Sequence, residues 1–269
     1  MPTTKVNGID LYFEEHGEGN PLLLVPGLGG TGSYWNPQIK PFSRNFRVIV
    51  HDHRGTGNST HDTSISYSVE QMAADLIGLM DALEIEKAHL LGHSTGGAIG
   101  QIISIEHPNR LMSAVLYASW VKADQFMKNV FDVRKTLLRE IGSHAYARAT
   151  PLFLYPDWWI NANEVVLGEL ERSTIANFPP VDIAISRCDA VLNFNRQAEL
   201  SDIRVPALVI CARDDFLTPM YCSQELAQKI PDAELVLLER GGHACSQTVV
   251  TEFNNLTLPW LLRQDEQNN

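Results

Sequence analysis

The chain has 269 residues, of which 44% are hydrophobic and 20% are charged, a balance typical of a globular protein with a sizeable core. Its net charge of −11 arises from 21 basic and 32 acidic residues without any run of Lys or Arg, which argues against nucleic-acid binding. No window of 18 uncharged apolar residues occurs, so the sequence predicts no membrane span.

The chain begins with predicted strands. Residues 5–13 alternate around Asn7-Gly8, which is typical of a β-hairpin. Short apolar runs bounded by glycine or polar turns then recur at 22–25, 48–50, 88–91, 114–117, 207–210 and 235–238. Such runs indicate strands that are buried on both faces of a parallel sheet.

Helical patterns lie between these strands. Apolar residues recur at a spacing of about 3.6 from Val69 to Leu83, and Ser68 with Gln71 predicts a capping box at the start of that helix. Further helices are predicted over 98–105, 223–230 and 252–262, followed by a disordered tail over 264–269. The alternation of strand and helix predicts a doubly wound α/β sheet.

One long segment, residues 121–198, breaks this alternation. It has the pattern of several short helices interrupted by prolines, with no convincing buried strand, and it is rich in aromatic residues. A helical cap over an active site explains this mixture better than a second core does. The sequence therefore predicts a core built from residues 1–120 and 199–269, with residues 121–198 inserted as a helical cap or lid.

The strongest chemical signal is the segment Gly92-His93-Ser94-Thr95-Gly96, which directly follows a predicted strand and precedes a predicted helix. A nucleophile at the tip of such a turn needs strained backbone angles and small neighbours two residues away on each side. The pattern therefore predicts Ser94 as a nucleophile. The alternative interpretation is a glycine-rich turn with no chemical role.

A serine nucleophile needs a base, and the base needs an acid to orient it; on this strand–turn–helix arrangement they follow the nucleophile in the order acid, then histidine. Of nine histidines, only His243 follows the last predicted strand, behind two glycines. Asp214 and Asp215 compete for the acid position. The spacing to Pro219, which is expected to start a helix, favours Asp215 and leaves Asp214 as a solvated or loop-capping carboxylate.

A second glycine-rich segment, residues 25–30, follows an early strand. Glycines there would let the backbone approach a reacting carbonyl group. We expect the main-chain amides of Leu28 and Thr95 to form an oxyanion hole, whose donors are typically worth about 3–4 kcal/mol each in the transition state. The alternative interpretation is an ordinary glycine turn.

These motifs together resemble the α/β-hydrolase family over roughly residues 3–263, through residues 26–29 and 52–59, the Ser94 turn, Asp215 and His243. Within that family, residues 29–38, 151–156 and 241–245 are similar to the aminoacrylate (carbamate-type) hydrolase of the pyrimidine-utilisation pathway. Residues 6–12 and the Ser94 turn are similar to 3-oxoadipate enol-lactonases. The resemblance implies a mostly parallel eight-stranded sheet flanked by helices. Pro26 departs from the histidine that is usual there.

The sequence predicts hydrolysis of a small ester, lactone, amide or carbamate in small-molecule catabolism. Two alternatives stay open: hydrolysis of a carbon–carbon bond or cofactor-free oxygenation by the same three residues, and a retired hydrolase that only binds ligand. His53, Trp120 and Trp158 are candidates to line an apolar pocket. Arg134 and Arg187 would pair with the carboxylate of an acidic substrate, or else are solvated helix residues.

The expected partner is a small-molecule substrate, without nucleic acid, membrane, metal or organic cofactor, and the sequence leaves monomer and homodimer open. No secretory signal is expected, because the first residues lack an apolar segment. The four cysteines show no C-x-x-C pair, and buried reduced thiols suit a cytoplasmic protein.

Overall fold

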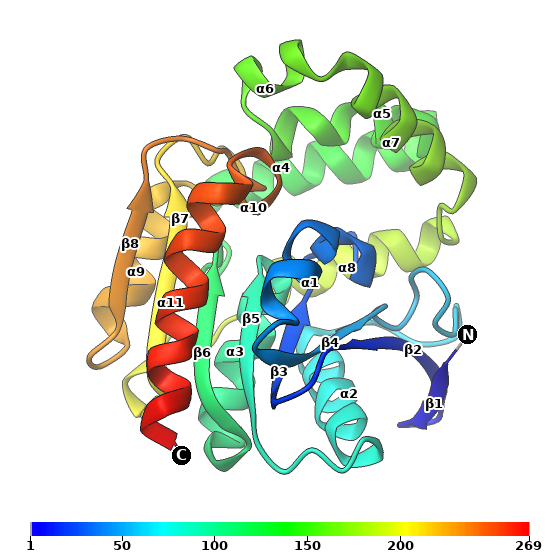
Figure 1. Cartoon of the computed structure of the whole chain (residues 1–269). Coiled ribbons are helices and arrows are strands. Elements are labelled where there is room, and N and C mark those ends of the chain that lie inside the picture. Colours follow the sequence, from blue (N-terminus) through cyan, green and yellow to red (C-terminus); the bar gives the residue numbers. More distant parts are fainter. Residues whose placement is uncertain (1, 269) are drawn as a thin grey trace.

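An eight-stranded sheet runs through the middle of the molecule, in a computed structural model that describes residues 2–268 (Figure 1). The strand order is β1-β2-β4-β3-β5-β6-β7-β8. The strands are β1 (Thr3–Val6), β2 (Ile9–His16), β3 (Asn20–Val25), β4 (Phe46–His51), β5 (Ala88–His93), β6 (Leu111–Tyr117), β7 (Ala207–Ala212) and β8 (Glu234–Leu238). Strand β2 pairs antiparallel with β1 and β4, and all other pairings are parallel. The predicted mostly parallel sheet is confirmed.

Helices cover both faces of this sheet. They are α1 (Asn36–Phe42), α2 (Val69–Ala82), α3 (Thr95–Glu106), α9 (Met220–Lys229), α10 (Cys245–Thr248) and α11 (Val250–Asn268). One buried cluster packs Phe42 of α1 and Phe253 of α11 against one face, and another packs Leu76 of α2 and Ile99 of α3 against the opposite face. The central strands are buried on both sides, as their continuous apolar runs predicted.

Two local predictions show how the sequence directs these elements. Asn7 and Gly8 both have positive φ, 45° and 81°, which is the backbone that a two-residue hairpin turn requires. The Ser68 hydroxyl accepts a hydrogen bond from the Gln71 amide at 3.0 Å and caps α2. The Gln71 side chain points to Asp75 instead of back to Ser68, so only half of the predicted capping box forms.

The C-terminal helix is longer than the sequence suggested. Helix α11 continues to residue 268, so the disordered tail expected from residue 264 is wrong over the described part, and residue 269 lies outside it. The reason is a long-range contact. The Asp265 carboxylate accepts from Asn20 of β3 at 2.7 Å and from His89 of β5 at 3.1 Å, which ties the last turns of the helix to the sheet.

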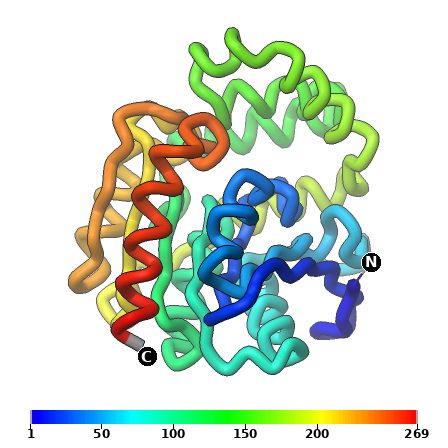
Figure 2. Tube along the Cα trace, in the orientation of Figure 1, coloured from blue at the N-terminus to red at the C-terminus, as the bar shows by residue number. Residues whose placement is uncertain are grey.

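The segment between β6 and β7 forms a helical cap. Its helices are α4 (Gln125–Thr136), η3 (Leu137–Ile141), α5 (Ser143–Leu154), α6 (Asp157–Ala162), α7 (Glu164–Ala176) and α8 (Val181–Asn193). A single bridge between Lys122 and Asn195 closes its base. Helices α4–α7 form a separate layer at one end of the sheet, and the loop before α10 reaches toward them (Figure 2). No described helix is both long and apolar enough to cross a membrane.

Candidate active site

A strained turn joins β5 to α3 and carries Ser94 at its tip. Ser94 has φ 54° and ψ −112°, in the region that side chains other than glycine rarely occupy. A Cβ atom on Gly92 would lie 2.2 Å from the Gly96 carbonyl oxygen, and one on Gly96 would lie 2.2 Å from the Val25 carbonyl oxygen. Glycine is therefore required on both sides, for the steric reason that the sequence pattern suggested.

Asp215 and His243 meet at the ends of β7 and β8. The His243 Nδ1 atom donates to the Asp215 carboxylate, at 3.0 Å from Oδ2 and 3.2 Å from Oδ1. Both side chains are buried. When Nδ1 carries its proton toward Asp215, Nε2 is the ring nitrogen that can accept a proton from another group.

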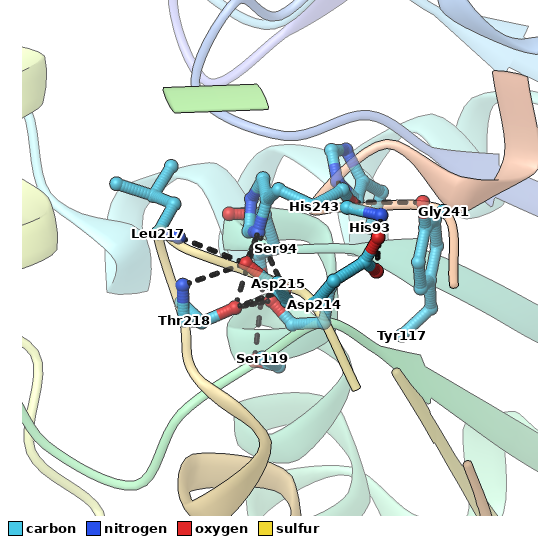
Figure 3. Close-up of polar contacts among 12 residues, drawn as sticks. His93, Ser94, Tyr117, Ser119, Asp214, Asp215, Leu217, Thr218, Gly241 and His243 are labelled. Atoms are coloured by element: carbon cyan, nitrogen blue, oxygen red, sulfur yellow. Dashed lines mark hydrogen bonds and ion pairs between the residues drawn. The ribbon is translucent and has the colours of Figure 1, made fainter. Parts of the chain in front are cut away.

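The Asp215 carboxylate is held by its own loop. Its Oδ1 accepts from the main-chain amides of Leu217 and Thr218 at 2.9 and 3.0 Å, and the Thr218 hydroxyl lies 2.9 Å from Oδ2 (Figure 3). That hydroxyl also lies 3.0 Å from the Ala118 carbonyl oxygen and 3.1 Å from His243 Nδ1. Sequence reasoning missed Thr218, although its place three residues after Asp215 and just before Pro219 was the available signal.

The competing carboxylate has a different role. Asp214 is exposed, and its Oδ1 accepts from the Gly242 amide at 2.8 Å, so it caps the loop that carries His243. The loop also needs its glycine. Gly242 has φ 67°, and a Cβ atom there would lie 2.8 Å from Pro156 and 2.9 Å from the Leu154 carbonyl oxygen of the cap. The loop-capping interpretation of Asp214 therefore fits its contacts.

The main chain of His243 is held by side chains from the ends of β5 and β6. Its carbonyl oxygen accepts from His93 Nε2 at 3.0 Å and from the Tyr117 hydroxyl at 2.9 Å. Burial lowers the pKa of His93 well below its ordinary value, so this ring is neutral. It stacks on Tyr34 with ring centroids 4.6 Å apart. His93 thus supports the main chain of His243 structurally.

Ser94 lies next to this assembly. The rings of His93 and His243 are 4.8 Å apart, and Figure 3 shows Ser94 beside them at the same end of the sheet. Within the described chain the Ser94 hydroxyl makes no hydrogen bond of its own, and the residue is 7% exposed. Catalytic hydrogen bonds in unliganded enzymes often tighten only when substrate binds.

The loop after β3 packs against the Ser94 turn. A Cβ atom on Gly27 would lie 3.2 Å from Ser94 Cβ, so the two segments are in close contact. Among residues 2–268 neither the Leu28 nor the Thr95 amide donates to a protein acceptor. For Thr95 this follows from its place as the first residue of α3. Both amides are therefore free to bind a substrate oxygen.

The same loop is anchored at several points. His53 Nε2 donates to the Pro26 carbonyl oxygen at 2.9 Å, and the Thr56 hydroxyl lies 2.8 Å from the Gly30 carbonyl oxygen. His53 is itself buried and accepts at Nδ1 from His51 Nε2, 3.2 Å away. Its contacts are thus those of a loop anchor, and its predicted place in a substrate pocket stays a prediction.

The other predicted pocket residues are distributed between core and cap. Trp120 is 1% exposed and packs against Phe194 with ring centroids 5.7 Å apart. Trp158 of α6 is half-buried, and the Arg240 guanidinium lies 4.6 Å above its ring, close to the His243 loop. A contact of either indole with substrate stays a prediction.

The two predicted cap arginines are both buried. Arg134 is 5% exposed, donates to the Tyr146 hydroxyl at 2.6 Å, and lies over three aromatic rings. Arg187 is 2% exposed and donates to two main-chain carbonyls. The alternative that they are solvated helix residues is therefore wrong, because α4 and α8 turn these side chains into the interior of the cap and the core. Substrate contact by either one remains a prediction.

A model of the alpha/beta hydrolase fold matches residues 20–245. The chain belongs to the α/β-hydrolase fold family. It is 41% identical over 258 residues to the "Putative carbamate hydrolase RutD" of Azorhizobium caulinodans, covering 96% of this chain and 97% of that relative. The enol-lactonase of Burkholderia xenovorans is 28% identical with a TM-score of 0.89, over 97% of this chain and all (100%) of the enol-lactonase. A thermophilic esterase from Thermogutta terrifontis is 25% identical with a TM-score of 0.86, over 98% and 97% of the two chains.

These comparisons confirm the family and both resemblances that the sequence motifs suggested, and they identify the chain as a hydrolase. In this α/β hydrolase, the strained serine, the His–Asp pair and the free amides all lie at the carboxyl ends of the parallel strands, where open α/β sheets bind ligands. No three His, Cys, Asp or Glu side chains of the described residues come together in a group suited to a metal ion.

Proposed function

We propose that this hydrolase cleaves a small ester, lactone, amide or carbamate through an acyl-enzyme intermediate, with Ser94, His243 and Asp215 as catalytic residues. The observation that carries the proposal is the buried His243–Asp215 pair, 3.0 Å apart, beside a serine held in a strained turn. A positioned acid, a positioned base and a hydroxyl without a protein partner at one sheet edge are what serine acyl transfer requires.

In the first half of the reaction, Ser94 Oγ attacks the substrate carbonyl carbon. His243 Nε2 accepts the hydroxyl proton and then gives it to the leaving oxygen or nitrogen, which departs as the acyl–serine bond remains. Asp215 stabilises the imidazolium ion that forms between these two transfers. Because Asp215 already holds Nδ1–H, the ring does not have to reorient for either step.

In the second half, water takes the place of the leaving group. His243 accepts a proton from the water as its oxygen attacks the acyl carbon, and returns a proton to Ser94 Oγ as the acid product leaves. In both tetrahedral intermediates the negative oxygen would accept from the Leu28 and Thr95 amides. These donors are fixed before the substrate arrives, and this preorganisation is why such a site lowers the barrier.

The names of similar proteins support a narrower choice of the bond that this hydrolase cleaves. One is named for carbamate hydrolysis, and solved structures of similar fold include an enol-lactonase and an esterase. All three reactions are attack on a carbonyl carbon bearing a heteroatom leaving group. We therefore place carbamates and lactones of small organic acids first among the candidate substrates.

The test is a panel of p-nitrophenyl esters, enol-lactones, carbamates and N-acyl amino acids, assayed with wild type and Ser94→Ala. The matched control is Ser104→Ala, which removes a buried hydroxyl without a partner from the same helix, α3. We expect Ser94→Ala to lose at least about 10³-fold in kcat, and the control to keep wild-type activity. A fluorophosphonate probe should label wild type and Ser104→Ala, but not Ser94→Ala.

Equal labelling of wild type and Ser94→Ala would refute the proposal. The panel also includes a vinylogous diketone. Turnover of that compound alone would point to carbon–carbon hydrolysis, and tight binding without any turnover or labelling would point to a ligand-binding protein.

A further inference from the structure

Arg187 is a buried cation whose position in the structure needs an explanation. It lies on cap helix α8, it is 2% exposed, and no carboxylate of the described chain forms an ion pair with it. Burial lowers the pKa of Arg187 to about 10, so the guanidinium is still charged at neutral pH. An unpaired buried charge is costly unless hydrogen bonds compensate it. The partners it binds therefore indicate its role.

Both terminal nitrogens of Arg187 bind main-chain oxygens of the core. Nη1 donates to the Arg54 carbonyl oxygen and Nη2 to the Leu28 carbonyl oxygen, each at 2.8 Å. The Arg54 segment is itself fixed, because the Arg54 side chain pairs with buried Asp75 at 2.5 and 2.6 Å. The guanidinium thus bridges a rigid core segment and the loop that carries the Leu28 amide.

The loop depends on this bridge at its centre. The carbonyl oxygens of Pro26 and Gly30 are held by core residues, but the carbonyl oxygen of Leu28, midway between them, is held by the cap. Gly30 packs directly against the Arg187 guanidinium. It has φ 76°, and a Cβ atom there would lie 2.8 Å from Arg187 Nη2. The loop is therefore shaped to receive a guanidinium from the cap.

We propose that Arg187 is a positioning residue, which sets the Leu28 amide in place for the reacting oxygen only when cap helix α8 is seated on the core. The inference rests on the proposed function, since it concerns the oxyanion hole of that reaction. Arg187 touches neither the nucleophile nor its base. It acts through the Leu28 carbonyl, so its loss weakens transition-state binding rather than substrate binding.

The test compares Arg187→Met and Arg187→Lys with two controls on the same helix pair. Ser186→Ala removes a cap-to-core hydrogen bond, from the Tyr67 amide at 2.8 Å, without touching the loop. Lys135→Met removes the cation that joins α4 to Asp189 of α8 at 2.9 Å. Active sites are counted with the fluorophosphonate, and kcat and KM for p-nitrophenyl acetate are then measured with the inhibition constant of a small boronic acid.

Complete removal of an oxyanion donor costs about 10²- to 10³-fold, so displacement of one donor should lower kcat per active site about 10- to 100-fold in Arg187→Met. The affinity for the tetrahedral boronate should fall by a similar factor, while KM stays within about twofold. The lysine of Arg187→Lys can reach only one of the two carbonyl oxygens. Its kcat per active site and its boronate affinity should therefore lie between those of wild type and Arg187→Met. Both controls should keep wild-type kcat and boronate affinity.

Wild-type kcat in both Arg187 variants would overturn the inference. A rise of KM confined to acidic substrates would also overturn it, because that pattern belongs to a carboxylate-binding arginine. If the wild-type protein itself is neither labelled nor active on any ester, the proposed function fails first, and the inference fails with it. Arg187→Lys keeps the charge and most of the side chain, so it provides the test if Arg187→Met does not fold.

Discussion

Replacing Tyr117 with phenylalanine removes a single hydroxyl group from beneath the His243 loop. That hydroxyl donates to the His243 carbonyl oxygen at 2.9 Å and accepts from the Ser246 amide at 3.0 Å. Tyr117 and Ser246 are both fully buried, so water cannot replace the lost contacts cheaply. We therefore expect Tyr117→Phe to lower both the free energy of unfolding and kcat.

The size of each effect follows from what each partner loses. The Ser246 amide is left without an acceptor, and an unsatisfied buried donor costs about 1–3 kcal/mol. The His243 carbonyl keeps its second donor, His93 at 3.0 Å, and so adds little to the loss. The free energy of unfolding should fall by about 2 kcal/mol. With one anchor of the loop gone, kcat should fall about tenfold, which corresponds to about 1.4 kcal/mol in the barrier.

Urea unfolding followed by tryptophan fluorescence measures the first effect, and hydrolysis of the best ester in the panel measures the second. Tyr221→Phe is the matched control. Its hydroxyl donates to Asp124 at 2.6 Å, but the residue is 46% exposed and lies outside the proposed site. Water can replace that partner, so the control should change the free energy of unfolding by less than about 1 kcal/mol and leave kcat unchanged. An unfolding free energy and a kcat for Tyr117→Phe equal to those of the control would refute the reasoning.

Three further outcomes are expected. Gly96→Ala places a Cβ atom 2.2 Å from the Val25 carbonyl oxygen, so kcat should fall more than about 10²-fold and urea unfolding should show a loss of at least about 1 kcal/mol. Asp215→Asn should lower kcat by about 10⁴-fold, whereas Asp214→Asn keeps an acceptor for its loop and should stay within about threefold in the same ester assay. Burial lowers the pKa of His51 from 6.5 to about 4, so between these pH values the unfolded chain binds a proton that the folded chain does not. The free energy of unfolding should therefore fall by about 1.4 kcal/mol per pH unit from this group as pH drops below 6.5, and a pH series of urea titrations should show a shallower slope in His51→Gln.

Much of the fold could be predicted from the sequence because its signals are local. The apolar runs of the central strands, the Asn7-Gly8 turn and the glycines around Ser94 each reflect a steric or burial requirement within a few residues. The order of acid and histidine was predictable for a different reason. Each follows a strand, and parallel strands bring their carboxyl ends to one edge.

What could not be predicted depends on contacts between distant segments. Arg134 and Arg187 are buried because of how α4 and α8 pack on the rest of the molecule. Both helices also carry exposed charged residues, so the sequence of either helix alone does not show which charged side chains are buried. The extension of α11 depends on Asp265 meeting strands more than 170 residues earlier in the chain. The role of Thr218 depends on Ala118, 100 residues away. A periodic pattern carries no information about such pairs.

The cap contacts the proposed site on two sides. Arg187 holds the Leu28 carbonyl, and the Leu154 carbonyl at the end of α5 accepts from the Ala244 amide at 3.1 Å, directly after His243. In both contacts the core contributes only main-chain atoms, so neither contact involves a core side chain of the proposed catalytic site. Under the proposed function, we expect that such a cap can change its inward side chains, and with them the substrate, while α8 and the end of α5 still hold the loops that carry Leu28 and His243. We therefore expect selectivity to reside in the inward side chains of α4–α7, and catalytic geometry in the main-chain contacts made by Arg187 of α8 and by the Leu154 carbonyl at the end of α5.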